Sequence, residues 1–330
     1  MNMKKILALL LALAMTMSVC AAMAEYPLTL KDQAGREVVI EAMPERIVSG
    51  YYISTSACIA LGLEDRMAAV EAKADKRNIY RLSAPQLIDR PNVGTAKNFD
   101  LEACLAAEPQ LVILPKRLKD AAAALAEFGI PALLVNPESG ALLEEMIMLI
   151  GEASGTAARA QELIGFGEQH LALCAEKLAG VTPVKALMLG NSDYMTCAPS
   201  DMYQHTVLLQ GGAENAAAQL TGGDFAALSY EQLLAMNPAA MIIPAEAAYT
   251  AADVLADKEL AAIDAVKNGA VYEMPRSFEA WDSPVPSGVL GSLWLASVLH
   301  PDAYAHDEYV NAAVKLYETF YGFTPDEGAL

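Results

Sequence analysis

Glu102-Ala-Cys-Leu-Ala-Ala-Glu-Pro-Gln-Leu-Val-Ile-Leu-Pro115 is matched, without a gap, by Glu231-Gln-Leu-Leu-Ala-Met-Asn-Pro-Ala-Ala-Met-Ile-Ile-Pro244. In each copy a Glu stands on a short predicted helix that a Pro ends, and an apolar strand and a second Pro follow. The two copies are 129 residues apart along their whole length. Because one such unit cannot bury its apolar face alone, the repeat predicts two similar lobes, with a small ligand held in the cleft between them.

Short apolar segments alternate with helical patterns in both halves of the chain. The predicted strands are 46–49, 67–70, one marked by Val93, 111–115 and 131–135 in the first half, and 184–189, 241–243 and 270–274 in the second. Strands that alternate with helices favour parallel pairing, because a parallel connection needs a crossover long enough to hold a helix. The predicted fold class is therefore α/β, with two similar lobes built on parallel-rich central sheets flanked by helices.

The middle of the chain is predicted to be helical. No strand is expected between residues 141 and 179, where the helical periodicity is interrupted at Gly151 and Gly155. The second piece, 156–178, would be roughly 35 Å long as one helix, which is enough to bridge two lobes. The predicted division is an N-terminal lobe at 25–150, a single long interlobe helix at 151–180 and a C-terminal lobe at 181–330.

The first 24 residues have the features of a signal peptide. Lys4 and Lys5 precede an apolar run over residues 6–19, and Ala22-Met23-Ala24 forms an A-x-A cleavage site. Cleavage after Ala24 would leave an exported, extracytoplasmic chain, either periplasmic or at the cell surface. Cys20 raises the alternative of a lipid anchor, although Met17-Ser18-Val19 matches the usual lipobox poorly.

The charge of the chain limits its partners. Removal of residues 1–24 takes away two lysines and no acid, which changes the formal charge from −19 to −21. Such a surface repels nucleic acid and anionic lipid, but a few basic groups in a cleft can still bind an anion. Four cysteines remain without a C-x-x-C spacing, and three of them lie in apolar helical patterns, so we expect no structural disulfide.

Several catalytic and metal-binding motifs are absent. The sequence contains no G-x-x-x-x-G-K-[ST], no G-x-S-x-G and no H-E-x-x-H, and its four histidines are scattered. We therefore expect neither a histidine metal site nor enzymatic activity. An exported enzyme that uses cleft carboxylates as acid and base remains an alternative.

Three segments resemble a known family. Asp32-Gln-Ala-Gly-Arg-Glu-Val38 in a predicted hairpin over 28–40, followed by Pro44-Glu-Arg-Ile-Val-Ser49, resembles the opening of ABC-transporter substrate-binding proteins for iron–siderophore, haem and vitamin B12 import. Asn98-Phe-Asp-Leu-Glu102 and Gly211-Gly-Ala-Glu-Asn215 are similar to later markers of that family. The resemblance covers nearly the whole mature chain and implies two α/β lobes joined by one long helix, which agrees with the pattern of the residues.

The resemblance also implies a role for the repeated Glu. In that family a Glu on each lobe docks onto arginines of the membrane permease, and Glu102 and Glu231 match those positions by motif. The chemistry is suitable, because Arg binds a carboxylate through two parallel hydrogen bonds. The alternative is that each Glu only stabilises the first turn of its helix.

Candidate ligand contacts follow from the ends of the predicted strands, because open α/β sheets bind ligands beyond the carboxyl ends of their strands. The aromatic candidates are suited to stacking and the basic ones to holding acidic groups. These residues are Tyr51, Tyr52, Tyr194, Phe225 and Trp281, with Lys97, Arg117 and Arg276.

Some of these candidates have a second interpretation. Only one of Tyr51 and Tyr52 can easily face inward from a strand, and Arg117 can be plain solvated charge. Trp281 lies in a Pro-rich loop, where it is either a ligand contact or a wedge that packs the loop onto the lobe. In the vitamin B12-binding relatives a Trp covers the ligand at the position of Phe225. The first lobe has Ala96 at the matching place, which argues against a corrinoid held between two aromatics.

The leading hypothesis is a monomeric, extracytoplasmic binding protein of an ABC importer that captures an iron complex, either siderophore or haem, or a corrinoid. Its partners would be the permease with its ATPase subunits and a small metal chelate. It would meet the membrane only through the permease or an anchor at Cys20. We expect no cofactor, although the ligand itself can contain iron or cobalt. The alternative ligand is a small oxyanion such as molybdate.

Overall fold

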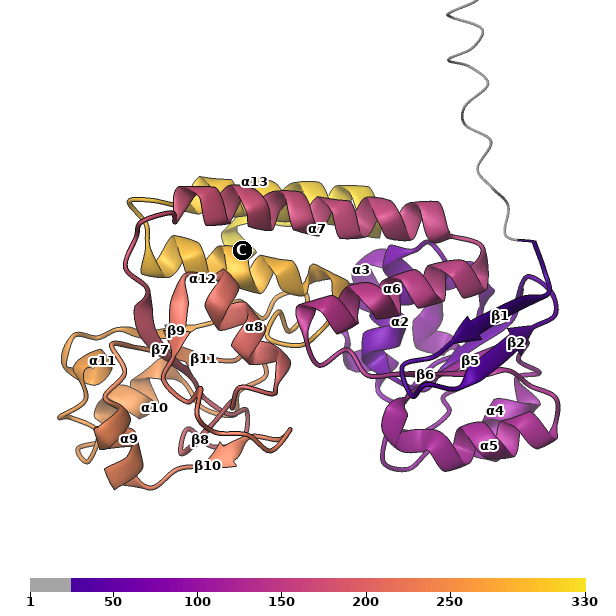
Figure 1. Cartoon of the computed structure of the whole chain (residues 1–330), viewed down its shortest axis with the longest axis horizontal. Coiled ribbons are helices and arrows are strands. Elements are labelled where there is room, and N and C mark those ends of the chain that lie inside the picture. Colours follow the sequence, from indigo (N-terminus) through magenta and orange to yellow (C-terminus); the bar gives the residue numbers. More distant parts are fainter. Residues whose placement is uncertain (1–24) are drawn as a thin grey trace, which may run out of the picture.

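The computed structural model describes residues 25–330, so the predicted signal peptide and Cys20 lie outside the described residues. Two α/β lobes lie beneath a layer of long helices (Figure 1). No helix in the described part of the chain has the length and apolar character needed to cross a membrane.

Each lobe contains a four-stranded parallel sheet. The N-terminal sheet has the order β4-β3-β5-β6, and its strands are β3 (Ile47–Ser49), β4 (Met67–Ala69), β5 (Leu111–Pro115) and β6 (Ala132–Val135). The C-terminal sheet has the order β12-β11-β7-β9, and its strands are β7 (Val184–Met188), β9 (Ala213–Asn215), β11 (Ala240–Ile243) and β12 (Val271–Glu273). Within each lobe the spatial order is second, first, third and fourth strand. The predicted fold class is confirmed.

The sequence repeat occupies equivalent places in the two lobes. Its helices are α4 (Leu101–Ala106) and α9 (Tyr230–Met236), and each leads into the third strand of its sheet, β5 or β11. The side chain of Asp100 caps α4 by accepting from the Ala103 N–H, and Ser229 caps α9 in a capping box with Gln232. Local capping and the following apolar strand therefore specify the same unit twice.

A β-hairpin is fixed onto the first sheet by a buried acid. It consists of β1 (Leu28–Lys31) and β2 (Glu37–Ile40), as predicted. The carboxylate of Asp32 accepts two hydrogen bonds from the Arg36 guanidinium, at 2.9 and 2.7 Å, and one from the backbone N–H of Leu134 in β6 at 3.1 Å. The Asp-x-x-Gly-Arg pattern thus has a structural role, because its Asp and Arg attach the hairpin to the first sheet.

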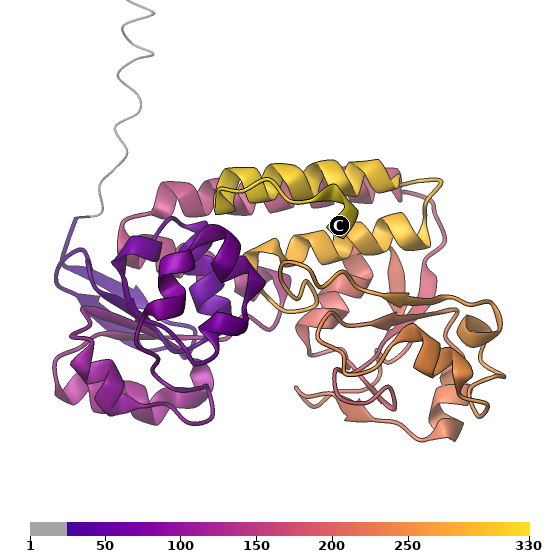
Figure 2. The ribbon, with the colours of Figure 1, turned by 180° about the vertical axis from the view of Figure 1, so that it is seen from behind.

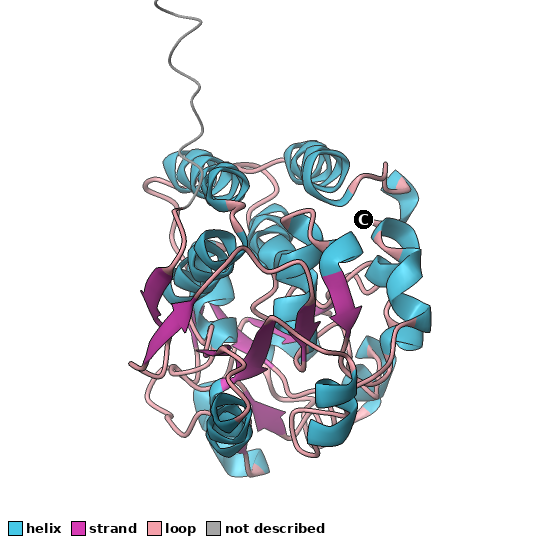
Figure 3. Cartoon of the chain, turned by 90° about the vertical axis from the view of Figure 1, so that its right-hand side faces the viewer, coloured by secondary structure: helices cyan, strands magenta, loops and turns pink. Residues whose placement is uncertain are grey.

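The remaining elements cover the sheets on both sides (Figure 3). They are α2 (Tyr52–Ala60), α3 (Asn78–Ser83), α5 (Lys119–Glu127), α6 (Gly140–Ser154), α7 (Ala157–Lys177), β8 (Thr196–Cys197), α8 (Tyr203–Gln210), β10 (Ala226–Ala227), α10 (Ala251–Ala256), α11 (Asp264–Lys267), α12 (Val289–Leu299) and α13 (His306–Leu316). The segment around Val93 is not the predicted strand, because only an isolated bridge joins Asn92 to Val70. The four described cysteines are buried and free.

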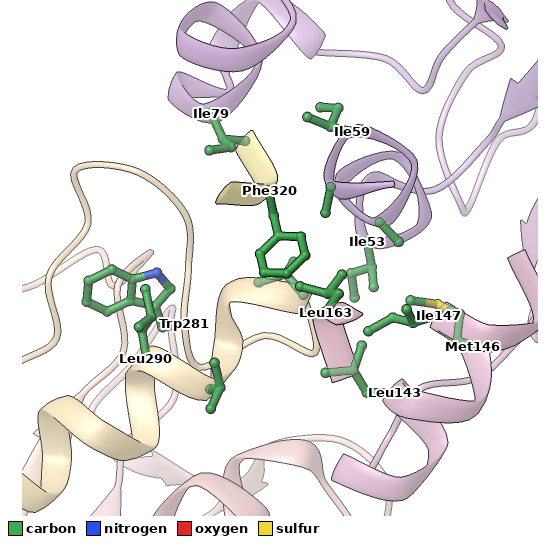
Figure 4. Close-up of a cluster of buried hydrophobic side chains, with 14 of the residues drawn as sticks. Ile53, Ile59, Ile79, Leu143, Met146, Ile147, Leu163, Trp281, Leu290 and Phe320 are labelled. Carbon is green, nitrogen blue, oxygen red and sulfur yellow. The ribbon is translucent and has the colours of Figure 1, made fainter. Parts of the chain in front are cut away.

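One long helix joins the two lobes, and a later turn of the chain packs back on the first lobe. α7 runs along the top from one lobe to the other (Figure 1), and a final π-helical turn, Tyr317–Tyr321, returns to α2 of the first lobe, as the view from behind shows (Figure 2). One apolar cluster crosses the junction (Figure 4). It contains Ile53 and Ile59 of α2, Leu163 of α7, Leu290 of α12 and Phe320. This shared core restricts lobe motion more than a lone helix would.

Candidate functional site

A pocket of about 160 Å³ lies between the lobes at the carboxyl ends of both sheets. The N-terminal lobe contributes residues from the start of α2 and from the loop after β4, and the C-terminal lobe contributes the loops after β11 and β12. The residues relevant to binding are Tyr52, Lys76, Arg77, Glu246 and Arg276. Three cations from two lobes therefore surround one small space.

Arg77 is the central cation of this pocket. Its guanidinium lies over the ring of Tyr52, with Cζ 4.1 Å from the ring centroid, and its Nη1 is 2.9 Å from Oε1 of Glu246. The Arg77 side chain is 27% exposed and that of Glu246 is 52% exposed. Arg276, from the opposite lobe, pairs with Glu273 at 3.0 Å and is more than half exposed.

Further polar contacts hold the two lobes together around the pocket. The Tyr52 hydroxyl donates to Ser283 Oγ at 2.9 Å, and the amide of Asn78 donates to the carbonyl of Ser277 at 3.0 Å. In each pair one residue belongs to the N-terminal lobe and the other to the C-terminal lobe. The two lobes are thus in direct contact on this side of the pocket.

Two buried carboxylates support the walls of the pocket. Glu71 accepts hydrogen bonds from Thr55 and Tyr80, both at 2.6 Å, and Glu279 accepts from Ser56 of α2 and from Ser287. Burial raises the pKa of both carboxyl groups, and these hydrogen bonds oppose the rise. Both carboxylate oxygens of Glu71 and of Glu279 accept hydrogen bonds. These two residues therefore have a structural role and hold helix α2 against its neighbours.

The predicted contacts Tyr51, Arg117 and Phe225 do not line this pocket. Tyr51 is 9% exposed and meets the ring of Tyr52 edge-on at 5.6 Å. Burial raises the pKa of Glu138, the Arg117 guanidinium opposes that rise, and Asp224 of the opposite lobe adds to it. The charge of Asp224 therefore acts across the junction on a carboxyl group of the first lobe.

Three predicted ligand contacts lie elsewhere. Trp281 is 1% exposed and donates from Nε1 to the Tyr317 hydroxyl at 2.9 Å, so the prediction of a ligand contact is wrong and the wedge interpretation holds. The Tyr194 hydroxyl donates to Asp257 at 3.2 Å within its own lobe, which turns it away from the expected role. Lys97 lies in an exposed turn and does not line the interlobe pocket.

Glu102 and Glu231 are both exposed and both occupy the second position of their helices. Helices α4 and α9 lie at the side of the molecule away from α7 (Figure 1). The two carboxylates are thus at matching places on the face opposite the interlobe helix.

Two residues of the pocket, Tyr52 and Arg276, were predicted from the sequence, but Lys76, Arg77 and Glu246 were not. Arg77 falls in the loop after a predicted strand, which the rule for strand ends covers, but no motif distinguishes it from its charged neighbours. Glu246 follows the second Pro of the repeat and had no signal of its own. Within residues 25–330, no group of three or more His, Cys, Asp or Glu side chains could hold a metal ion.

Comparison with known proteins shows the family of this chain. Residues 47–277 match the family model described as periplasmic binding protein. The chain belongs to this family. The molybdate-binding protein MolA of Haemophilus influenzae is 25% identical over 98% of this chain and 99% of its own length. YvrC of Bacillus subtilis, an uncharacterised ABC transporter substrate-binding lipoprotein, is 26% identical over 84% of this chain and 87% of its own.

Solved structures of periplasmic binding proteins share the fold. The structure of MolA bound to molybdate covers 91% of this chain and 99% of its own, with a TM-score of 0.81 and 23% identity. The haem-binding protein HutB of Vibrio cholerae covers 78% and 99%, with a TM-score of 0.66 and 23% identity. These are solute-binding proteins and not enzymes, which is also the character of the family to which this chain belongs.

Proposed function

We propose that this periplasmic binding protein is the extracytoplasmic substrate-binding component of an ABC importer and that it captures a small oxyanion between its lobes. The observation that carries the proposal is the pocket of about 160 Å³ that Lys76, Arg77 and Arg276 line from two lobes. Guanidinium groups bind tetrahedral oxyanions with several N–H donors at once. The likeness to MolA over nearly the full length of both chains supports molybdate as the first ligand to test.

The size of the pocket favours an oxyanion over the iron complexes and corrinoids that the sequence suggested first. Pockets for drug-sized ligands usually enclose about 300–1,000 Å³, and a haem or a corrinoid needs space in or above that range. The pocket holds about 160 Å³. A chelate ligand would require the lobes to separate, against the contacts of Tyr52 with Ser283 and of Asn78 with Ser277.

The proposal includes delivery to a permease and its ATPase subunits. Glu102 and Glu231 would dock onto permease arginines, one from each lobe. The lobes would be residues 25–150 and 181–330, joined through 151–180, and the chain would be exported by residues 1–24. Cys20 is the point of attachment if the mature protein carries a lipid. The protein would work as a monomer without a cofactor of its own.

Isothermal titration of the mature chain tests the ligand class. Molybdate, tungstate and sulfate should give saturable binding, while haem, cyanocobalamin and a ferric siderophore should not. Arg276→Ala should weaken oxyanion binding, because it removes one pocket cation, while Lys258→Ala, an exposed charge outside the pocket, should leave it unchanged. Saturable binding of haem or a corrinoid without binding of any oxyanion would reject the proposal in favour of the chelate.

A further inference from the structure

The guanidinium of Arg77 is held in place independently of its carboxylate partner. It lies over the ring of Tyr52 at 4.1 Å, and the Tyr52 hydroxyl is itself fixed by a 2.9 Å hydrogen bond to Ser283 of the other lobe. An Arg that lies over an aromatic ring is restricted in its motion, while its N–H donors stay free to bind in the plane of the guanidinium. Arg77 therefore keeps its position if Glu246 leaves.

Glu246 is held far less firmly. It lies three residues after β11, its side chain is 52% exposed, and its one hydrogen bond among the described residues is the 2.9 Å contact with Arg77. A half-exposed ion pair of this kind is weak, because water competes for both charges. Glu246 can leave the pair without disturbing a buried group.

The carboxylate of Glu246 has the chemistry of the ligand class proposed above. A carboxylate and an oxyanion both present negatively charged oxygens to the same guanidinium donors. Of the five N–H donors of Arg77, the structure engages one, through Nη1. An oxyanion with several charged oxygens can engage more of these donors than Glu246 does.

We propose that Glu246 is a tethered competitor for the anion: it pairs with Arg77 while the pocket is empty, and the incoming oxyanion replaces it. This inference rests on the proposed function, because it requires an anion in the pocket. The walls need not separate for the exchange, since the contacts Tyr52–Ser283 and Asn78–Ser277 do not involve Glu246. Glu246 thereby sets the affinity, and favours dianions, whose charge exceeds its own, over monoanions.

The exchange predicts a gain of affinity when the competitor is neutralised. Glu246→Gln removes one negative charge that both competes with molybdate for Arg77 and repels it. The Kd for molybdate should therefore fall roughly three- to tenfold. Glu259→Gln makes the same change of net charge at an exposed site outside the pocket and should leave the Kd within about twofold. Circular dichroism of both variants should match the parent protein, because both side chains are exposed.

Two measurements test this inference. Molybdate is titrated into the mature parent protein, Glu246→Gln and Glu259→Gln, and the crystal structure of the molybdate-loaded parent is determined. The inference requires the gain in Glu246→Gln alone and, in the loaded crystal, an Arg77 that contacts the oxyanion with Glu246 more than 4 Å away. It is overturned if the Kd is unchanged or rises, if Glu259→Gln gains as much, or if the Arg77–Glu246 pair persists in the loaded crystal. Absence of oxyanion binding to the parent protein overturns the proposed function itself, and this inference with it.

Discussion

The two lobes have the same frame but differ where they meet. The helices α4 and α9 start with capped first turns that carry Glu102 and Glu231, and both lead into the third strand of a sheet with the same strand order. The support of the helix ends is also repeated, because Arg46 before β3 donates to the carbonyl of Ala107, directly after α4, and Lys185 in β7 donates to that of Met236, the last residue of α9. The interlobe faces are unlike, with Arg77 on one side and Glu246 on the other. Elements that build a lobe are thus duplicated, and elements that line the interlobe pocket are not.

The largest effect is expected from removing the duplicated carboxylates together. The double variant Glu102→Arg, Glu231→Arg should abolish transport in vesicles that contain the cognate permease and ATPase. Each charge reversal at a paired carboxylate costs about 2–5 kcal/mol of docking free energy, and the two sites lie on separate lobes. Ligand affinity, measured by titration, should not change, because neither residue lines the interlobe pocket.

Glu176→Arg provides the control for charge. Glu176 is exposed on α7, on the opposite side of the molecule from α4 and α9 (Figure 1). Transport by this variant should equal that of the parent. If the double variant transports normally while it binds ligand, the two repeated acids serve only their helices.

The second effect concerns a residue that has no counterpart in the first lobe. Trp281→Ala should lower the free energy of unfolding by about 3–5 kcal/mol, because a 1% exposed Trp leaves a large cavity and an unpaired Tyr317 hydroxyl. Urea unfolding followed by circular dichroism measures the change. Trp281→Phe keeps most of the packing and should cost about half as much. A loss below about 1 kcal/mol for Trp281→Ala would show that the C-terminal loop is not part of the shared core.

The frame of this molecule was predictable from its sequence because it depends on local patterns. The repeat, the Pro residues, the apolar strands and the helical periodicity are read within a few residues, and they predicted two α/β lobes and the helix near 156–178. The strand predicted around Val93 was wrong, because one β-branched residue between turns is compatible with an isolated bridge as well as with a strand.

The interlobe surface was not predictable in the same way. The Pro-rich loop around Trp281 suggested a side chain free to contact a ligand. In the structure the turn Tyr317–Tyr321, which comes later in the chain, covers Trp281. Arg77 and Glu246 are 169 residues apart and meet only when the lobes are assembled. Tyr52 and Arg276 were found through the rule for strand ends, whereas Tyr194 obeyed the same rule and turned toward Asp257 of its own lobe.

The third effect separates the two basic residues that support the helix ends. Arg46 donates to the carbonyls of both Ala107 and Glu108, whereas Lys185 donates to Met236 alone. Arg46→Ala should therefore lower the free energy of unfolding by about 1–2 kcal/mol and Lys185→Ala by about 0.5–1 kcal/mol. Arg46→Lys should fall between the parent and Arg46→Ala. Equal urea midpoints for the two Ala variants would mean that the second contact of Arg46 contributes nothing.

The smallest effect should come from the residues that end the repeated helices. Glu108 and Asn237 stand at equivalent places before a Pro, and both have left-handed backbone, with φ of 49° and 40°. Asn tolerates this region and Glu does not, since only Gly and the short polar residues enter it at low cost. Glu108→Asn should therefore raise the free energy of unfolding by about 0.5–1 kcal/mol, measured by urea unfolding of the mature chain. Glu108→Ala removes the same charge but has no short polar side chain to hydrogen-bond the left-handed backbone, so it should bring no gain. If the Ala variant gains as much as the Asn variant, the exposed charge, and not the backbone, distinguishes the first copy from the second.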